Sequence, residues 1–188
     1  MKKLLSLTLV LCLALVLVAC STGVAAAADV KTGLGIVTSI ASSTPVGEKD
    51  GEKTNGNAQV DSTICAVTLD ANGVILTISF DVAQTKIAFS PEGAIVSDPA
   101  AEIRSKKELK DDYGMKNASG IGLEVYEQIA NLEKFAVGKT VAEVLATPTY
   151  VKDDHHTAVP DAADLKTAVT ISIGDYLKAL EKAAANAQ

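Results

Sequence analysis

A strong β-hairpin signal lies between residues 59 and 82 of the chain. Two segments rich in β-branched residues, 59–69 and 74–82, flank the turn sequence Asp70-Ala71-Asn72-Gly73. Asn-Gly pairs supply the positive φ angles that tight hairpins need. The sequence therefore predicts an antiparallel hairpin, and residues 85–89 predict a third strand directly after it.

The segment before the hairpin predicts one strand and one loop. Residues 32–41 have strand character, and Leu34, Ile36 and Ile40 would share one face of that strand. Residues 42–58 are dense in Gly, Ser, Asn and charged side chains. We expect them to form an exposed loop.

The second half of the chain predicts helices. Residues 99–110 are charged and partly helical in pattern, and residues 121–136 have the spacing of an amphipathic helix that ends at Gly138. The apolar positions of that helix are Leu123, Tyr126, Ile129, Ala130 and Leu132. A Thr-x-x-Glu capping pattern at Thr140 opens another short helix.

The C-terminal segment predicts a strand that runs into the last helix. Val169 and Ile171 alternate with the hydroxyl side chains of Thr170 and Ser172, which is a strand pattern. The Ser-x-x-Asp sequence that starts at Ser172 is typical of a helix N-terminus, where free backbone N–H groups favour an anion. The order of segments predicts an α+β fold. Its sheet would be antiparallel, hairpin-based and half-barrel-like, packed by three or four helices, with a strand and then a helix at the C-terminus.

The first residues have the pattern of a secretory leader. A basic start at residues 1–3 precedes an apolar run at residues 4–18, which is too short to favour a membrane-spanning helix. The Leu-Val-Ala-Cys sequence that ends at Cys20 resembles the lipobox of bacterial lipoproteins. That resemblance implies removal of residues 1–19 and a diacylglyceryl group on the Cys20 sulfur. Cleavage after the alanines at 26–28 is the alternative.

Three segments follow from this reading: the leader, a flexible tether at residues 20–31, and a single domain at residues 32–188. The formal net charge is −6, and it becomes −8 when Lys2 and Lys3 leave with the leader. An acidic domain argues against nucleic acid as a partner. Cys65 would be the remaining cysteine of the domain, and its apolar surroundings predict a buried, unreactive thiol.

Two other patterns are weak as site signals. The run Asp153-Asp154-His155-His156 offers metal-ligand types, but adjacent histidines point apart and no third histidine or second domain cysteine completes a zinc set. We expect a solvated loop there and no metal site. Gly33-Leu34-Gly35 lacks the third glycine of a dinucleotide-binding fingerprint.

The order of segments resembles the FMN-binding domain found in flavin subunits of Rnf and Nqr electron-transport complexes and in lipoproteins of extracellular electron transfer. The resemblance rests on the strand at 33–40 and on the hairpin with its Asp-x-x-Gly turn. It also rests on a glycine-containing loop, here Tyr113, Gly114 and Met115.

The same family ends in Asp-x-x-Ser-Gly-Ala-Thr-x-Ser, where a flavin transferase joins the FMN phosphate to the threonine hydroxyl. The corresponding polar residues of this chain are Asp164, Thr167, Thr170 and Ser172. Ala168 stands at the glycine position and Val169 at the alanine position. Both replacements add bulk where the phosphate and the transferase would have to fit.

The resemblance implies a membrane-anchored extracytoplasmic electron carrier, with no catalytic residues of its own. FMN would be bound either through a Thr170 phosphoester or without a covalent bond, and Tyr113 and Met115 would form a wall for its ring. Its partners would be the membrane, a flavin transferase and redox proteins. The alternative is a cofactor-free binding or structural lipoprotein of the same fold. Thr170 would then be a strand threonine beside a helix cap, and residues 111–116 a surface loop.

Overall fold

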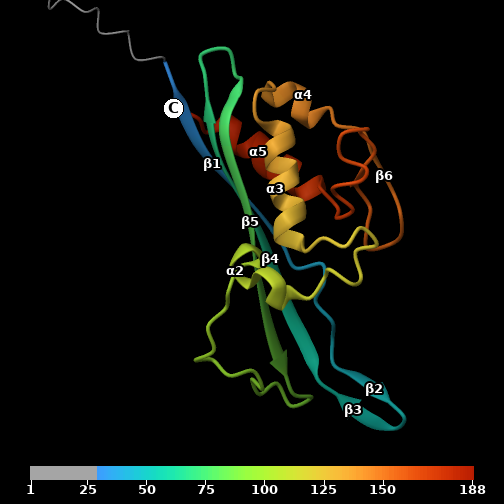
Figure 1. Ribbon diagram of the computed structural model, residues 1–188. Helices are drawn as coiled ribbons and strands as arrows, with labels where there is room; N and C mark the ends of the chain where they lie inside the picture. Colours follow the sequence, from blue (N-terminus) through green and yellow to red (C-terminus); the bar gives the residue numbers. More distant parts are fainter. Residues whose placement is uncertain (1–28) are drawn as a thin grey trace, which may run out of the picture. The chain divides into compact units, whose positions relative to one another are not determined.

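The predicted hairpin forms the centre of the fold in the computed structural model (Figure 1). Strand β4 (Gly56–Leu69) pairs antiparallel with β5 (Ile75–Phe89) along its whole length. The turn between them is held by the Asp70 carboxylate, which accepts hydrogen bonds from the backbone N–H groups of Asn72 and Val74, both at 2.8 Å. These hydrogen bonds lower the pKa of Asp70. Gly73 takes the positive φ of 77° that the turn needs.

The structure describes residues 29–188. The expected leader, the expected lipidation site at Cys20 and most of the expected tether lie outside the described residues. Within residues 29–188, no helix combines the length and the apolar character needed to cross a membrane.

A third strand, β1 (Lys31–Ser39), pairs antiparallel with β4, and the order across the main sheet is β1-β4-β5. This strand confirms the prediction for residues 32–41. The separate strand predicted at 85–89 is wrong, because β5 continues without a break through these residues. The hairpin is therefore longer than its sequence signal suggested.

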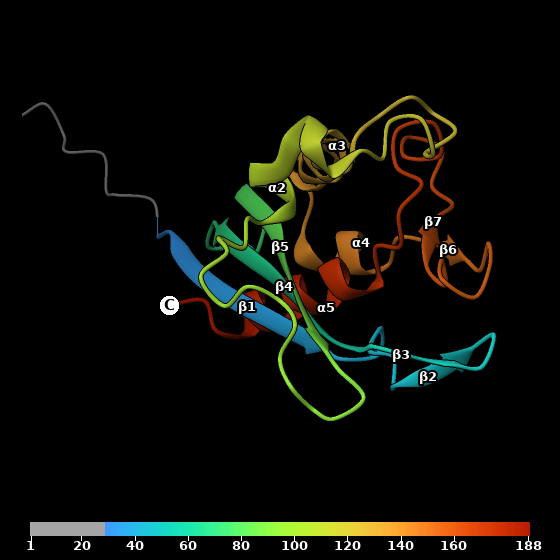
Figure 2. The same cartoon turned by 90° about the horizontal axis from the view of Figure 1, so that it is seen from below.

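Helices cover one face of this sheet (Figures 1 and 2). The C-terminal helix α5 (Gly174–Ala185) packs on β1 and β4, α3 (Val125–Ala136) packs on β5, and α4 (Val141–Leu145) packs on α5. Fully buried side chains from both layers form the core, including Ile75, Phe80, Ile129, Leu132, Ile173 and Leu180. The α+β prediction, with an antiparallel sheet and a C-terminal helix on it, is confirmed.

Two glycines of β1 allow α5 to lie directly on the strand backbone. A Cβ atom at Gly33 would overlap the carbonyl oxygen of Ala183, and one at Gly35 would overlap the carbonyl oxygen of Ala179. The Gly-x-Gly pair therefore has a packing role. The chain end also covers the free edge of β1, because Thr32 and Gln188 exchange backbone hydrogen bonds of 3.0 and 3.1 Å.

The apolar side chains expected to share one face of this strand point away from the core. Leu34 is 53% exposed, Ile36 48% and Ile40 68%. The core side of β1 consists of the two glycines and Val37. Leu34 and Ile36 belong instead to the sheet face that the helices leave open.

Helix α3 differs from its prediction in its start and in its buried face. It begins at Val125 rather than at residue 121, and Ala130 is exposed. Its buried residues are Val125, Gln128, Ile129, Leu132 and Ala136. The capping box predicted for α4 is confirmed: Thr140 Oγ1 accepts a hydrogen bond from the Glu143 N–H at 3.3 Å, and the Glu143 carboxylate accepts one from the Thr140 N–H at 2.7 Å.

The segment before α5 contains no strand, so the predicted C-terminal strand is wrong. Val169, Ile171 and Ile173 are buried in alternation, but the segment has no ladder partner. Helix α5 begins at Gly174 with Ile173 as a cap residue that makes no side-chain bond. Ser172 does not cap the helix, because its hydroxyl accepts a hydrogen bond from the Ala158 N–H at 3.2 Å.

Short elements complete the fold. The expected loop at 42–58 contains a small hairpin, β2 (Gly47–Lys49) with β3 (Glu52–Thr54), in which Glu48 faces Lys53 and Lys49 faces Glu52. The other short elements are α2 (Lys106–Leu109), the 3-10 helix η1 (Lys110–Tyr113), β6 (Thr149–Tyr150) and β7 (Val159–Pro160).

Candidate functional site

A cleft of about 510 Å³ lies at one end of the helix-covered face of the sheet. Its floor comes from β4 and β5, and its walls come from α2, η1, the residues around Met115, the loop at 155–158 and the start of α5. Segments far apart in the sequence thus meet at one cavity.

The floor carries polar side chains on strand positions that continue the core side of the hairpin. Gln59 is 8% exposed and Thr63 is 5% exposed. The Gln59 side-chain N–H donates to Asp61 Oδ2 at 2.8 Å, and the Gln84 side-chain N–H donates to Asp61 Oδ1, also at 2.8 Å. We call Gln59, Asp61 and Gln84 the polar triad. Buried polar groups are costly unless they are bonded, and here the buried Gln59 is bonded to the half-buried Asp61. Polar side chains that gather at a cavity make the cleft a candidate binding site.

The backbone at Gln59 is also fixed. Its N–H donates to Ser43 Oγ at 3.0 Å, and the Ser43 hydroxyl donates back to the Gln59 carbonyl at 3.2 Å. Asp61 and Gln84 are directly opposite each other in the β4–β5 register. The triad is therefore held in place by strand geometry before any ligand arrives.

One wall of the cleft contains two of the residues that the sequence analysis singled out as possible flavin contacts. Tyr113 and Met115 both line the cavity. Between them, Gly114 ends η1 in the left-handed conformation with φ 77°, which a side chain would strain. Gly114 itself is exposed and does not line the cavity, so it shapes the loop and makes no wall.

Two lysines, Lys106 of α2 and Lys178 of α5, line the same cavity. Lys106 Nζ lies 5.3 Å from the centre of the Tyr113 ring, in a cation–π arrangement. Lys178 Nζ pairs with Asp175 Oδ1 at 2.8 Å. Within the described residues Lys106 has no carboxylate partner. The cleft therefore contains an unpaired cation near its aromatic wall and an acidic floor.

Tyr176 connects the cleft to the core. It is 5% exposed, and its ring meets the Phe80 ring edge to face, with the centres 5.4 Å apart and an angle of 87°. Burial raises the pKa of the Tyr176 hydroxyl well above its ordinary value. The hydroxyl therefore stays neutral at physiological pH.

Helix α3 holds two walls of the cleft through a pair of buried side chains one turn apart. The Glu124 carboxylate, which precedes the helix, is 2% exposed and accepts the N–H groups of Met115 and Lys116 at 2.8 Å each. Gln128 Oε1 accepts the N–H of Thr170 at 2.8 Å and the N–H of Ile171 at 3.2 Å. These two side chains fix the segments that carry Met115 and Ser172.

Gln128 is fully buried, and both ends of its amide are used. Its Nε2 donates to the Leu123 carbonyl at 3.3 Å and lies 3.7 Å from the Met115 sulfur. Because the oxygen faces backbone N–H groups and the nitrogen faces a carbonyl, the amide has one orientation. Gln128 is thus a structural junction between α3 and the segment before α5.

The residues of the predicted terminal motif are not gathered at one place. Ser172 lines the cleft, whereas Thr170 lines a second cavity of about 300 Å³ that also includes Lys166. The Thr170 hydroxyl lies 3.3 Å from both the Ser119 carbonyl oxygen and Gln128 Oε1. Thr167 and Asp164 are exposed near the turn at 163–168 and line neither of these two cavities.

The histidine pair lies at the cleft, next to Asp153. His156 Nδ1 is 2.7 Å from Asp153 Oδ1, and this hydrogen bond lowers the pKa of the Asp153 carboxyl. Across residues 29–188, no group of three or more His, Cys, Asp or Glu side chains is placed to hold a metal ion. His155 and His156 both line the cleft, so they contribute to its shape.

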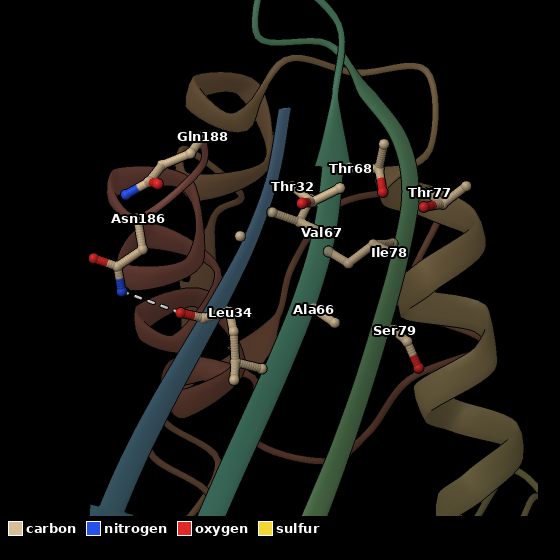
Figure 3. Close-up of a pocket in the computed structure, with 11 residues that line it drawn as sticks. Thr32, Leu34, Ala66, Val67, Thr68, Thr77, Ile78, Ser79, Asn186 and Gln188 are labelled. Atoms are coloured by element: carbon tan, nitrogen blue, oxygen red, sulfur yellow. Dashed lines mark hydrogen bonds between the residues drawn. The ribbon is translucent and has the colours of Figure 1, made fainter. Parts of the chain in front are cut away.

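A second surface feature lies on the opposite face of the sheet (Figure 3). This shallow groove of about 700 Å³ is lined by Leu34, by small and hydroxyl side chains of the three strands, and by Asn186 and Gln188. Asn186 Nδ2 donates to the Leu34 carbonyl at 3.1 Å, as the dashed line shows. No titratable side chain of the described chain lines this groove, so it offers less chemistry than the cleft.

Sequence reasoning missed the polar triad and the pair Glu124–Gln128. A signal for the triad was present, because Gln59, Asp61 and Thr63 are in phase with the buried Cys65 along one strand. Polar residues at core positions indicate a functional site once the core side is known. No comparable signal identifies Glu124 or Gln128, since each looks like an ordinary helix residue.

The comparisons with known proteins give no relative: no family model, curated protein or solved structure matches this chain.

Proposed function

We propose that this chain is an extracytoplasmic electron carrier, held at the membrane by a lipid on Cys20, and that it binds FMN in the cleft without a covalent bond. The polar triad is the observation that carries the proposal. It places a carboxylate and two amides on the core side of a long strand pair, beside an aromatic wall and a cation. This is the composition of a small-molecule site.

The residues of the cleft fit the chemical groups of FMN. Tyr113 and Met115 offer an aromatic and a sulfur contact for a flat apolar ring. Lys106 offers a positive charge for a phosphate, and the first turn of α5 adds the positive end of a helix. The cavity of about 510 Å³ falls within the range of ligand pockets, roughly 300–1,000 Å³.

The non-covalent form is proposed because of where Thr170 lies. Its hydroxyl is close to the Ser119 carbonyl and opens to a cavity other than the one lined by Tyr113 and Met115. A phosphoester at Thr170 would have to replace those contacts. Bound FMN would supply the electron transfer, and the protein residues would bind and orient it.

Titration of FMN into the full-length protein in detergent tests the proposal. Quenching of flavin fluorescence that saturates at one FMN per chain is expected. Absence of saturable binding up to about 1 mM FMN would overturn it and would favour the cofactor-free lipoprotein. Coexpression with a flavin transferase tests the covalent alternative, because a flavin mass that survives denaturation and is lost in Thr170→Ala would establish the phosphoester.

The anchor has its own test. Intact mass of protein from a bacterial membrane should show a diacylglyceryl group, and Cys20→Ala should release the protein from the membrane fraction. A membrane-free wild type with a mature start after residue 28 would establish the alternative cleavage.

A further inference from the structure

The polar triad has an arrangement that selects for one part of a ligand. Gln59 and Asp61 are two residues apart on β4, so both point to the same side of the sheet. Gln84 faces Asp61 across the strand pair. All three side chains line the cleft.

The hydrogen bonds within the triad determine which atoms remain for a ligand. An ionised carboxylate accepts and does not donate, so the nitrogen of each amide has to face Asp61. Both amide oxygens are therefore directed away from the carboxylate. In the described part of the chain neither amide oxygen accepts a hydrogen bond. Every fully buried side-chain polar atom there does have a partner, so these two unpaired oxygens are not fully buried. Both oxygens are therefore reachable from the cleft that their side chains line.

The triad consequently presents two amide oxygens and the remaining lone pairs of a carboxylate. Such a surface attracts hydrogen-bond donors. It repels a phosphate, because the phosphate oxygens are negatively charged acceptors. Each amide also keeps one N–H. A hydroxyl group matches this set best, because it can donate to the oxygens and accept from the N–H groups.

We infer that the triad binds the hydroxyl groups of the polyol chain of the ligand, while the Lys106 ammonium group pairs with its phosphate. This inference rests on the proposed function, and it assigns the orientation of FMN in the cleft. The ring edge of a flavin fits the triad less well, because its single N–H lies between two carbonyl oxygens that would face the acceptors.

Three ligands separate the polyol from the ring and from the phosphate. FMN has all three groups, riboflavin lacks the phosphate, and lumiflavin lacks both the phosphate and the polyol chain. The affinity of each is measured by fluorescence titration with the full-length wild type and with Asp61→Asn. In this variant one glutamine has to turn its amide around, and the charge of the floor is lost.

Asp61→Asn should lower the affinity for FMN and for riboflavin by about tenfold or more, as expected for the loss of charge-assisted hydrogen bonds. Lumiflavin affinity should stay within about twofold of wild type. Asp50→Asn is the matched control, since Asp50 is exposed on the β2–β3 turn with φ 56°, a conformation that asparagine tolerates. The control should bind all three ligands as wild type does.

The other outcomes separate an error in the role of the triad from an error in the proposed function. Equal loss for lumiflavin would assign the triad to the ring edge, and unchanged affinities would remove it from the site; either result overturns the inference and leaves FMN binding intact. A wild type that binds none of the three ligands overturns the proposed function together with the inference. Thermal unfolding of Asp61→Asn establishes that the variant is folded.

Discussion

The two halves of the β4–β5 hairpin differ on the same side of the same sheet. In the half near the turn, Cys65, Val67 and Phe80 face the helices and are at most 2% exposed. In the other half, Gln59 and Asp61 occupy equivalent positions and face the cleft. The strand pair is therefore longer than the core that it helps to build, and the extra length carries polar chemistry.

The difference predicts that substitutions in the two halves act on different properties. Substitutions in the apolar half should lower the free energy of unfolding, and those in the polar half should lower ligand affinity. Phe80 and Cys65 lie in the apolar half. Gln128 and Lys106 contact the cleft or its wall from the helices, and the expected loss of stability is largest for Phe80 and smallest for Lys106.

Phe80→Ala should have the largest effect. Phe80 is 1% exposed and packs against Tyr176, so its truncation leaves a cavity and should lower the free energy of unfolding by about 3–5 kcal/mol. Urea unfolding measures this loss. Phe89→Ala is the control, because Phe89 is half-buried over Gly56 at the far end of the strand and should cost less. Equal losses would contradict a core confined to the turn half.

Gln128→Leu should come next. The leucine is close in size but leaves the N–H groups of Thr170 and Ile171 without an acceptor, which should cost about 1–3 kcal/mol. The same change should weaken FMN binding, because Gln128 also contacts Met115 in the cleft wall. Asn131→Leu is the control, since the Asn131 amide bonds a single group among residues 29–188, the Ala168 carbonyl. Unchanged stability in Gln128→Leu would show that the junction is dispensable.

The buried thiol of Cys65, in the apolar half, should make the free energy of unfolding depend on pH. Burial raises the pKa of its thiol from 9.0 to about 12, so the folded protein keeps the proton that the unfolded chain releases above pH 9.0. Below pH 9.0 this thiol does not change the free energy of unfolding. Above pH 9.0 the free energy of unfolding falls by about 1.4 kcal/mol per pH unit until the pKa of the folded state is reached.

Urea unfolding at about pH 8 and about pH 10 tests this dependence in wild type and in Cys65→Ala. The alanine variant should lose less stability between the two pH values, whatever its stability at the lower one. Equal pH slopes for the two proteins would contradict the burial of an ionisable thiol there.

Lys106→Met should leave stability almost unchanged. Lys106 lies at the cleft. Its loss should lower the affinity for FMN by about fivefold to tenfold. The affinity for riboflavin should stay constant, because riboflavin has no phosphate. Fluorescence titration measures both. Lys134→Met, at an exposed position of α3, should change neither affinity. Equal loss for riboflavin would place the phosphate elsewhere.

Local signals in the sequence were sufficient for much of the fold. The Asp70–Gly73 turn predicted the hairpin, and the Thr140 capping box predicted α4, because each depends on contacts within a few residues. The alternation of Val169 and Ile171 was also correct as a burial pattern. It did not produce a strand, because strand formation needs a ladder partner that no local pattern specifies.

The cleft was predictable only in part. Tyr113, Met115 and Ser172 do line it, although Thr170 does not. The polar triad depends on how far the helices extend over the sheet, which is a property of the packed fold. Ser172 was misread as a helix cap for a similar reason: its hydroxyl is occupied by Ala158, fourteen residues earlier in the chain.

The central claim is that the polar half of the hairpin serves binding and contributes little to stability. Replacing the triad by apolar side chains, with Gln59→Leu, Asp61→Val and Gln84→Leu in one protein, tests it most directly. Urea unfolding should give a free energy within about 1 kcal/mol of wild type, or above it, because replacing every partner of a hydrogen-bonded set by apolar groups leaves none of them unpaired and is often nearly neutral. FMN titration should show that binding is lost. A stability loss above about 3 kcal/mol, or FMN binding as tight as in wild type, would contradict the claim.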